Sequence, residues 1–349
     1  MSLRFQWQQI ADRSRALTYD DVLIVPQKLN MRSRRDPNLG TQFTKKHKLT
    51  IPLIAANMDT VSESEMMIAM HKLGGVAILH RFMTIEEQVN EMKKARDAGV
   101  SILSASVGVN AEYMDRAKAL IGAGANVLTI DIAHGHSIAM LETMKDLKNA
   151  FPDVEIVAGN IATPEAAQDL IEAGADAIKV GIGPGSMCTT RIITGCGVPQ
   201  LTAVALCAEV AKSNNVPLIA DGGVKTSGDI VKALCAGAES VMLGSLLAGT
   251  LESPGEIKSG KKQYRGMASK AAQNSWRGGV PEGMAAEGEA TMINIKGHTK
   301  DVVNELCGGI RSGMTYVDAG EIHEMCKKAF FVEMSSAGYF ESRAHGVKN

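Results

Sequence analysis

The chain has 349 residues, 45% of them hydrophobic and 21% charged, which is the balance of a globular protein with one large domain or two smaller ones. Its formal net charge of −1 provides no positive field for nucleic acid or an anionic membrane, so we expect neither as a partner. The polar first 21 residues, and the lack of any run of about 18 apolar residues, argue against a secretion signal or a membrane span.

The six cysteines form no CxxC pair and no paired spacing, which argues against a disulfide framework or a zinc cluster. This pattern suits a reducing compartment, so we expect a cytoplasmic enzyme. We expect one domain over residues 1–349.

Short apolar runs alternate with segments of helical spacing along most of the chain. The apolar runs are typical of buried parallel strands, and they cover residues 52–56, 76–80, 102–107, 127–132, 155–159, 177–181, 217–221 and 240–244. Helices are expected at residues 63–73, 85–98, 113–123, 139–150, 164–173, 203–213 and 229–236.

A repeated pattern supports this alternation. Residues 121–127, 171–177 and 234–240 share one helix-ending, strand-starting sequence, with glycine where a helix terminus requires a left-handed conformation. Eight parallel strands with intervening helices predict an α/β fold, a (β/α)8 TIM barrel. An open doubly wound sheet would use the same elements, but the chain lacks its early GxGxxG motif.

Two connections are longer than the others. Strand ends are about 20 to 28 residues apart up to Gly181, whereas 40 residues separate Gly181 from Asp221, so the sixth strand is followed by an insertion. We call residues 182–199 the catalytic loop. After the eighth strand, residues 253–297 are polar and weakly periodic, and we expect them to form a flap over the barrel mouth.

The catalytic loop has the composition of a nucleophile's site. Glycines at 181, 183 and 185 allow a sharp turn and close approach to a ligand, and Cys188 follows beside Thr190 and Arg191. The alternative is a mobile surface loop with an incidental thiol.

Short glycine-containing turns follow the seventh and eighth strands, where barrels commonly bind phosphate through backbone N–H groups. These are Gly222 with Gly223, and Gly244 with Ser245. Asp221 would repel a phosphate, so we expect it to bind sugar hydroxyls.

Several motifs, in order over nearly the whole chain, resemble the inosine monophosphate dehydrogenase and guanosine monophosphate reductase family. They are Leu17-Thr18-Tyr19-Asp20-Asp21-Val22-Leu23, Ala56-Asn57-Met58-Asp59-Thr60-Val61, residues 181–191, Asp221-Gly222-Gly223, Gly244-Ser245 and Tyr264-Arg265-Gly266-Met267. The resemblance implies a purine-nucleotide barrel, usually a homotetramer, in which a loop cysteine attacks C2 of the base and a nicotinamide cofactor exchanges hydride with that carbon.

The resemblance favours the reductase branch, which converts GMP to IMP with NADPH. The dehydrogenases usually insert CBS modules after the second strand and carry an Arg-Tyr dyad in the flap. Here residues 81–101 are one helix long, so no CBS insertion is expected, and the flap has Trp276-Arg277 instead. Residues 131–135, 278–280 and 285–288 resemble the reductases.

By this resemblance Cys188 is the nucleophile, and Thr190 with Glu287 forms a proton relay. The implied nucleotide-binding residues are Ser186, Asp221, Gly222, Gly223, Gly244, Ser245, Gly266, Met267, Ala268, Ala286 and Gly288. The implied cofactor-side residues are Arg81, Asp131, Ile132 and Ala133, although Arg81 could instead form a surface salt bridge. Carbonyls of Gly183, Gly185 and Arg191 match a potassium site.

Some residues depart from the reductase pattern. Gly283-Met284 stands where the reductase flap commonly has Tyr-Arg, and residues 280–283 and 341–347 resemble the dehydrogenases. A dehydrogenase without CBS modules is therefore the second hypothesis, and a non-catalytic nucleotide sensor is a third. The presence of the cysteine, threonine and glutamate together argues against a sensor, because a protein that only binds a nucleotide needs none of them.

Overall fold

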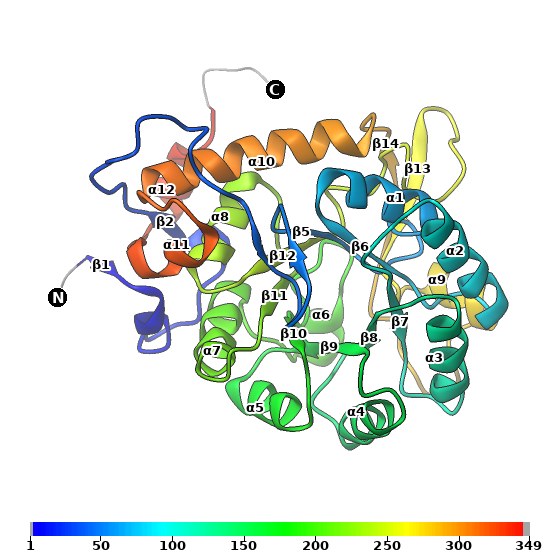
Figure 1. The fold of residues 1–349 in the computed structure, drawn as a ribbon. Helices are drawn as coiled ribbons and strands as arrows, with labels where there is room; N and C mark the ends of the chain where they lie inside the picture. Colours follow the sequence, from blue (N-terminus) through cyan, green and yellow to red (C-terminus); the bar gives the residue numbers. More distant parts are fainter. Residues whose placement is uncertain (1–2, 345–349) are drawn as a thin grey trace.

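The computed structural model describes residues 3–344, and its centre is a closed barrel of eight parallel strands (Figure 1). The strands are β5 (Leu53–Ala55), β6 (Val76–Leu79), β7 (Ser104–Val107), β8 (Val127–Asp131), β9 (Glu155–Ile161), β10 (Ala177–Val180), β11 (Leu218–Asp221) and β12 (Ser240–Leu243). Neighbours in sequence pair in parallel, and β12 pairs with β5 to close the ring. The TIM barrel prediction is confirmed, and each strand lies within two residues of its expected bounds.

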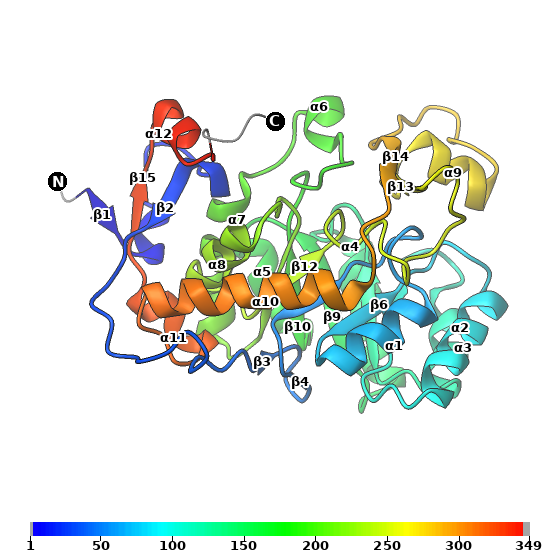
Figure 2. The same ribbon diagram turned by 90° about the horizontal axis from the view of Figure 1, so that it is seen from above.

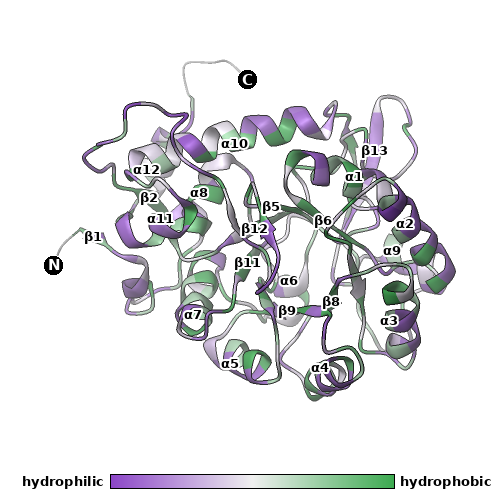
Figure 3. Ribbon diagram, in the orientation of Figure 1, coloured by the Kyte–Doolittle hydropathy of each residue, from purple (hydrophilic) through white to green (hydrophobic). Residues whose placement is uncertain are grey.

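Seven helices lie where the apolar periodicity predicts them. They are α1 (Ser64–Leu73), α2 (Ile85–Asp97), α3 (Tyr113–Gly122), α4 (Ile138–Ala150), α5 (Pro164–Glu172), α7 (Gln200–Ser213) and α8 (Ser227–Cys235). The barrel strands are mostly apolar, whereas the outer faces of the helices are largely polar (Figure 3). The glycines of the repeated pattern, Gly124, Gly174 and Gly237, have φ of +115°, +103° and +109°, as the left-handed helix ends require.

The eighth barrel helix, α10 (Thr299–Tyr316), was missing from the predicted elements. Its buried residues Val303, Leu306, Ile310 and Met314 do have helical spacing, so the signal was present in the sequence. The helix packs on α8 and α1 and completes the outer ring.

Two glycines allow α10 to lie directly on α8. A Cβ atom at Gly313 would come within 2.5 and 2.6 Å of the two γ-methyl groups of Val231, and one at Gly309 would collide with Ser227. The side chains of Ser227 and Val231 on α8 therefore pack directly on the α10 backbone, which leaves no space for a side chain at Gly309 or Gly313.

The catalytic loop and the flap lie at the same end of the barrel (Figure 2). The loop contains α6 (Thr190–Thr194). The flap was expected to be weakly periodic, but it contains regular structure: a hairpin of β13 (Lys261–Arg265) and β14 (Ala290–Asn294), and the helix α9 (Lys270–Arg277). Arg265 fixes this hairpin to the end of β5 through an ion pair with Asp59, at 2.5 Å.

Short elements cover the rest of the barrel. The hairpin of β3 (Thr41–Gln42) and β4 (Lys48–Leu49) lies at the opposite end from the flap (Figure 2). The two ends of the chain meet in a small sheet of β1 (Arg4–Phe5), β15 (Phe331–Glu333) and β2 (Val22–Ile24), beside α11 (Ile322–Lys328) and α12 (Ser336–Glu341). Within residues 3–344, no helix has the length and apolar character needed to cross a bilayer.

Replacing Gly313 with alanine should destabilise the protein, by about 1–3 kcal/mol, because the new methyl group must displace Val231. Gly308→Ala is the matched control in the same helix, because a Cβ there meets nothing within 4 Å. The control should be stabilised by up to about 1 kcal/mol through helix propensity. Thermal unfolding midpoints of the two variants check this, and equal shifts would contradict the close contact.

Candidate active site

One cavity of about 650 Å³ lies at the carboxyl ends of the strands, between the catalytic loop and the flap. Its wall includes most of the residues predicted from the sequence: Cys188, Thr190, Glu287, Ser186, Asp221, Gly222, Gly223, Gly244, Ser245, Gly266, Met267, Ala268, Arg81, Asp131, Ile132, Ala133, Gly183, Gly185 and Arg191. Ala286 and Gly288 flank Glu287 but are not on the wall. The volume is within the range of small-ligand sites.

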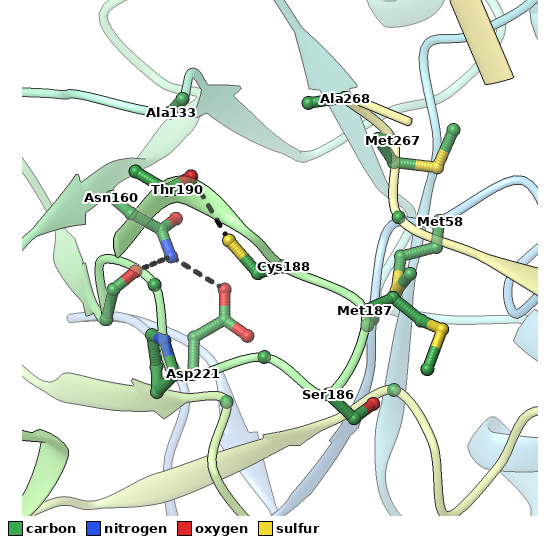
Figure 4. Close-up of a pocket in the computed structure, with 18 of the residues that line it drawn as sticks. Met58, Ala133, Asn160, Ser186, Met187, Cys188, Thr190, Asp221, Met267 and Ala268 are labelled. Atoms are coloured by element: carbon green, nitrogen blue, oxygen red, sulfur yellow. Dashed lines mark hydrogen bonds between the residues drawn. The ribbon is translucent and has the colours of Figure 1, made fainter. Parts of the chain in front are cut away.

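The predicted cysteine, threonine and glutamate form a continuous hydrogen-bonded chain. The Cys188 thiol donates to the Thr190 hydroxyl at 3.2 Å (Figure 4), and that hydroxyl donates to Glu287 Oε2 at 2.8 Å. Thr190 and Glu287 are 97 residues apart in sequence. Each donor points towards the carboxylate, so a proton on sulfur has a direct route to Glu287.

Backbone hydrogen bonds bring the flap carboxylate to the loop. The N–H of Thr189 donates to the carbonyl of Glu287 at 3.1 Å, and the N–H of Glu289 donates to that of Met187 at 2.9 Å. A Cβ atom at Gly266 would lie 2.9 Å from the Met187 carbonyl, so the flap approaches the loop as closely as glycine permits.

The surroundings of the six thiols distinguish Cys188 from the rest. Cys207, Cys235, Cys307 and Cys326 are buried, and burial raises the pKa of Cys207 to about 12, so these are not nucleophiles. Cys196 is exposed on the catalytic loop, and within residues 3–344 its sulfur hydrogen-bonds only to the carbonyl of Thr194. Cys188 is the thiol that reaches both the cavity and a proton acceptor.

The glycine loops after β11 and β12 form another part of the wall. Gly222 and Gly223 have φ of +94° and +79°, a conformation that favours glycine. The carbon of a side chain at Gly222 would lie 2.9 Å from Pro184 of the catalytic loop. Ser186 and Tyr264 meet through their hydroxyls at 3.2 Å, so the loop, the flap and the strand ends converge here.

A buried lysine connects two of the predicted binding residues. Lys179 on β10 is 1% exposed, and its ammonium group lies 2.9 Å from Asp131 Oδ1 and 2.8 Å from Asp221 Oδ2. It also donates to Asn160, which itself donates to Asp221 at 2.9 Å (Figure 4). Only Oδ2 of Asp221 has a protein partner among residues 3–344, so Oδ1 is available to a ligand.

The charges of this cluster determine its pKa shifts. Burial opposes the positive charge of Lys179, but the attraction of Asp131 and Asp221 outweighs burial and raises the pKa of Lys179 above its usual value. In the same way, burial tends to raise the pKa of Asp131, but Lys179 and Arg81 outweigh it and the pKa is lowered. Lys179 and Asp131 are therefore both ionised over the physiological pH range.

The predicted potassium ligands fit in part. The Arg191 guanidinium donates to the carbonyl of Ile182, at 3.1 and 3.2 Å, and to that of Val198 at 2.6 Å, so this side chain fixes both ends of the catalytic loop. The Gly185 carbonyl accepts the N–H of Cys188 at 3.1 Å. Arg191 could offer a cation only its backbone carbonyl.

The residues that depart from the reductase pattern lie at the edge of the cavity. Met284 is 60% exposed and lies on the wall, and Gly283 has φ of +78°. Of the tail motif 341–347, residues 345–347 lie outside the described residues.

Comparison with known proteins establishes the family. The family model of the IMP dehydrogenase / GMP reductase domain matches residues 16–345. The chain belongs to this family. Among curated relatives of the IMP dehydrogenase / GMP reductase family, it is 36% identical to inosine-5'-monophosphate dehydrogenase from Nitrosopumilus maritimus, over 95% of this chain and 98% of the relative. It is 37% identical to GMP reductase from Leishmania donovani, over 95% of this chain and 97% of the relative.

A solved structure of the family has the same fold. It is a GMP reductase variant from Trypanosoma brucei in complex with guanosine 5'-monophosphate, with a TM-score of 0.91 and 34% identity over 97% of this chain and 100% of that one. Members of the family are oxidoreductases that use a nicotinamide cofactor. Both activities occur among the relatives at similar identity, so identity alone does not separate them.

Sequence reasoning missed several residues of this site. Lys179 sits inside an apolar strand, and no local signal shows that its ammonium group lies between two carboxylates. Thr18 and Tyr19 reach the wall from the N-terminal segment. Their motif was noted, but only a tertiary contact could place them there.

Replacing Lys179 with methionine should make stability depend on pH. Without the ammonium group, burial should raise the pKa of Asp131 above its usual value, so stability falls as pH rises through the new pKa. In the wild type, Asp131 has a lowered pKa and Lys179 a raised one, so their contribution is constant from about pH 5 to 9.

The measurement is the thermal midpoint of Lys179→Met from pH 5 to 9, with a loss of about 3–5 kcal/mol expected at neutral pH. Adding Asp131→Asn removes one of the two unpaired carboxylates and should reduce the pH slope. If Lys179→Met alone showed the same dependence of the thermal midpoint on pH as the wild type, this account of the cluster would be refuted.

Proposed function

We propose that the protein is a GMP reductase, which converts GMP, NADPH and a proton to IMP, NADP⁺ and ammonia. The observation that carries the proposal is the hydrogen-bonded chain from Cys188 through Thr190 to Glu287, at the wall of a nucleotide-sized cavity. The GMP bound to the structural relative supports the choice of substrate.

The geometry suits a two-stage reaction. The proton of Cys188 passes through Thr190 to Glu287, and the sulfur forms a bond to C2 of the purine. The bond from C2 to the amino group then breaks, and ammonia leaves with the proton returned along the same chain. When bound, the cofactor supplies a hydride to C2. The carbon–sulfur bond breaks, IMP is released, and the thiolate takes a proton from solvent.

The remaining residues position the reactants in this proposal. Backbone N–H groups of Gly222, Gly223, Gly244 and Ser245, with the Ser186 hydroxyl, hold the phosphate, and Asp221 Oδ1 accepts ribose hydroxyls. The flap contributes Gly266, Met267, Ala268, Ala286 and Gly288 around the base. Arg81, Asp131, Ile132 and Ala133 face the cofactor.

The proposal also includes a potassium ion on carbonyls of Gly183, Gly185 and Arg191, a homotetramer and a cytoplasmic location. The ion would stiffen the loop that carries Cys188. Arg191 already performs part of this task through its side chain.

A dehydrogenase that oxidises IMP with NAD is the second candidate. It is favoured by relatives such as the inosine-5'-monophosphate dehydrogenase of Cryptosporidium parvum, which is 40% identical over 96% of each chain. That reaction needs an activated water, and the flap has Trp276 and Arg277 in place of the Arg-Tyr dyad expected of the dehydrogenases. The reductase requires no such water.

Absorbance at 340 nm tests the two activities directly. With GMP and NADPH the signal should fall while ammonia appears, and with IMP and NAD it should not rise. A rise with IMP alone would instead establish the dehydrogenase, and no change in either reaction would favour a nucleotide sensor.

Variants test the relay. Cys188→Ala should abolish turnover, and Glu287→Gln or Thr190→Val should lower kcat by about 10²- to 10⁴-fold, because proton transfer is lost while nucleotide contacts remain. Cys196→Ala, an exposed thiol on the same loop, is the matched control and should retain full activity. Turnover by Cys188→Ala would refute the nucleophile assignment.

A further inference from the structure

Two arginines on the cavity wall stand out because each lies over an aromatic ring. Arg81 follows β6, and its guanidinium carbon is 4.9 Å from the ring centre of Phe82. Arg277 ends α9 in the flap and lies 5.0 Å from the ring centre of Trp276. The two rings meet edge to face at 5.4 Å, so the barrel and the flap together build one cationic, aromatic surface.

Neither guanidinium has a carboxylate within 4 Å in the part of the chain that the structure describes. Arg81 donates to the backbone carbonyl of Asp131 at 3.3 Å, and Arg277 donates to the amide oxygen of Gln273. The salt-bridge alternative for Arg81 is therefore wrong. The nearby acids have other partners, because Asp131 pairs with Lys179 and Glu112 with Arg116.

Charges of both signs act on Arg81. Burial lowers its pKa, the attraction of Asp131 opposes this effect, and repulsion by Arg116 and Arg277 adds to it. The indole N–H of Trp276 is also shielded from solvent and has no hydrogen-bond partner among residues 3–344. Two guanidinium groups thus lie on the same stretch of the wall, with the Trp276 ring beside them.

We propose that Arg81, Trp276 and Arg277 form a subsite for a phosphate group of the dinucleotide cofactor, and that this group is the 2′-phosphate of NADPH. The inference rests on the proposed function. A phosphate monoester carries up to two negative charges and has oxygens for both guanidiniums, while the Trp276 ring supports Arg277. The pyrophosphate offers the same chemistry with less charge on each phosphate.

The topology separates this subsite from the nucleotide phosphate. The glycine loops follow β11 and β12, whereas Arg81 follows β6, and in the closed barrel β12 and β5 lie between β11 and β6. Figure 2 shows α9 on the side of α2 and α3, away from α7 and α8. The GMP phosphate and the proposed subsite are therefore on different parts of the rim.

Calorimetric titration of the GMP-saturated protein with NADP⁺ or NAD⁺ tests the proposal without turnover, because GMP and the oxidised cofactor do not react. Arg277→Gln and Arg81→Gln should weaken NADP⁺ binding on the order of tenfold, through loss of a charged hydrogen bond, and leave NAD⁺ nearly unchanged. Adenosine 2′,5′-bisphosphate, titrated alone, should show the same loss.

Control variants distinguish a loss of cofactor binding from a loss of folding. Arg277→Lys retains the charge and should bind NADP⁺ more tightly than Arg277→Gln does. Arg96→Gln removes an arginine of α2 that pairs with Asp97, and it should change neither constant. An unchanged Kd for GMP in every variant shows that the fold and the nucleotide site are intact.

If the glutamine variants bound NADP⁺ and NAD⁺ more weakly by the same factor, the subsite would bind the pyrophosphate that both cofactors share. That result would overturn the 2′-phosphate assignment. Unchanged constants for both cofactors in the two glutamine variants would overturn the subsite itself. A wild-type protein that binds GMP but neither dinucleotide would remove the proposed function instead.

Discussion

The buried ammonium group of Lys179 is the constraint on which the floor of the cavity depends. It extends from β10 to Asp131 on β8, Asn160 on β9 and Asp221 on β11, so it joins four adjacent strands of the barrel. Two carboxylates that would otherwise repel each other are held at fixed positions by one cation. In the proposed mechanism one of them faces the nucleotide and the other the cofactor. In that mechanism the lysine would therefore set the separation between the groups that bind the two reactants.

The second constraint is the contact between the catalytic loop and the flap. The thiol belongs to one segment and the terminal proton acceptor to the other, and backbone hydrogen bonds at Thr189 and Glu289 fix their register. The ion pair of Arg265 with Asp59 ties the flap to the barrel. The hydrogen-bonded chain from Cys188 to Glu287 exists only while these contacts hold, so in the proposed mechanism the position of the flap would control proton transfer from Cys188. The same flap brings Arg277 towards Arg81.

The sequence was sufficient for the barrel and for most of the cavity wall, for identifiable reasons. Strand runs, helix periodicity and helix-ending glycines are local patterns, and strand ends must converge at one end of a parallel barrel. The eighth helix was missed although Val303, Leu306, Ile310 and Met314 have the required spacing. The role of Lys179 and the position of Arg277 near Arg81 could not be predicted, because each depends on contacts between segments far apart in sequence. The roles of the site residues stay predictions until the variants are measured.

The contact of α10 with α8 has a consequence for how the chain folds during synthesis. The strands of the barrel are complete once Leu243 has been made, yet the groove between α8 and α1 is filled only by residues up to Tyr316. Until that helix emerges from the ribosome, the apolar surfaces of α1 and α8 that pack on it remain uncovered. The flap is translated in this interval, before α10 has been made. Closure of the ring and assembly of the catalytic end are therefore late and nearly simultaneous events.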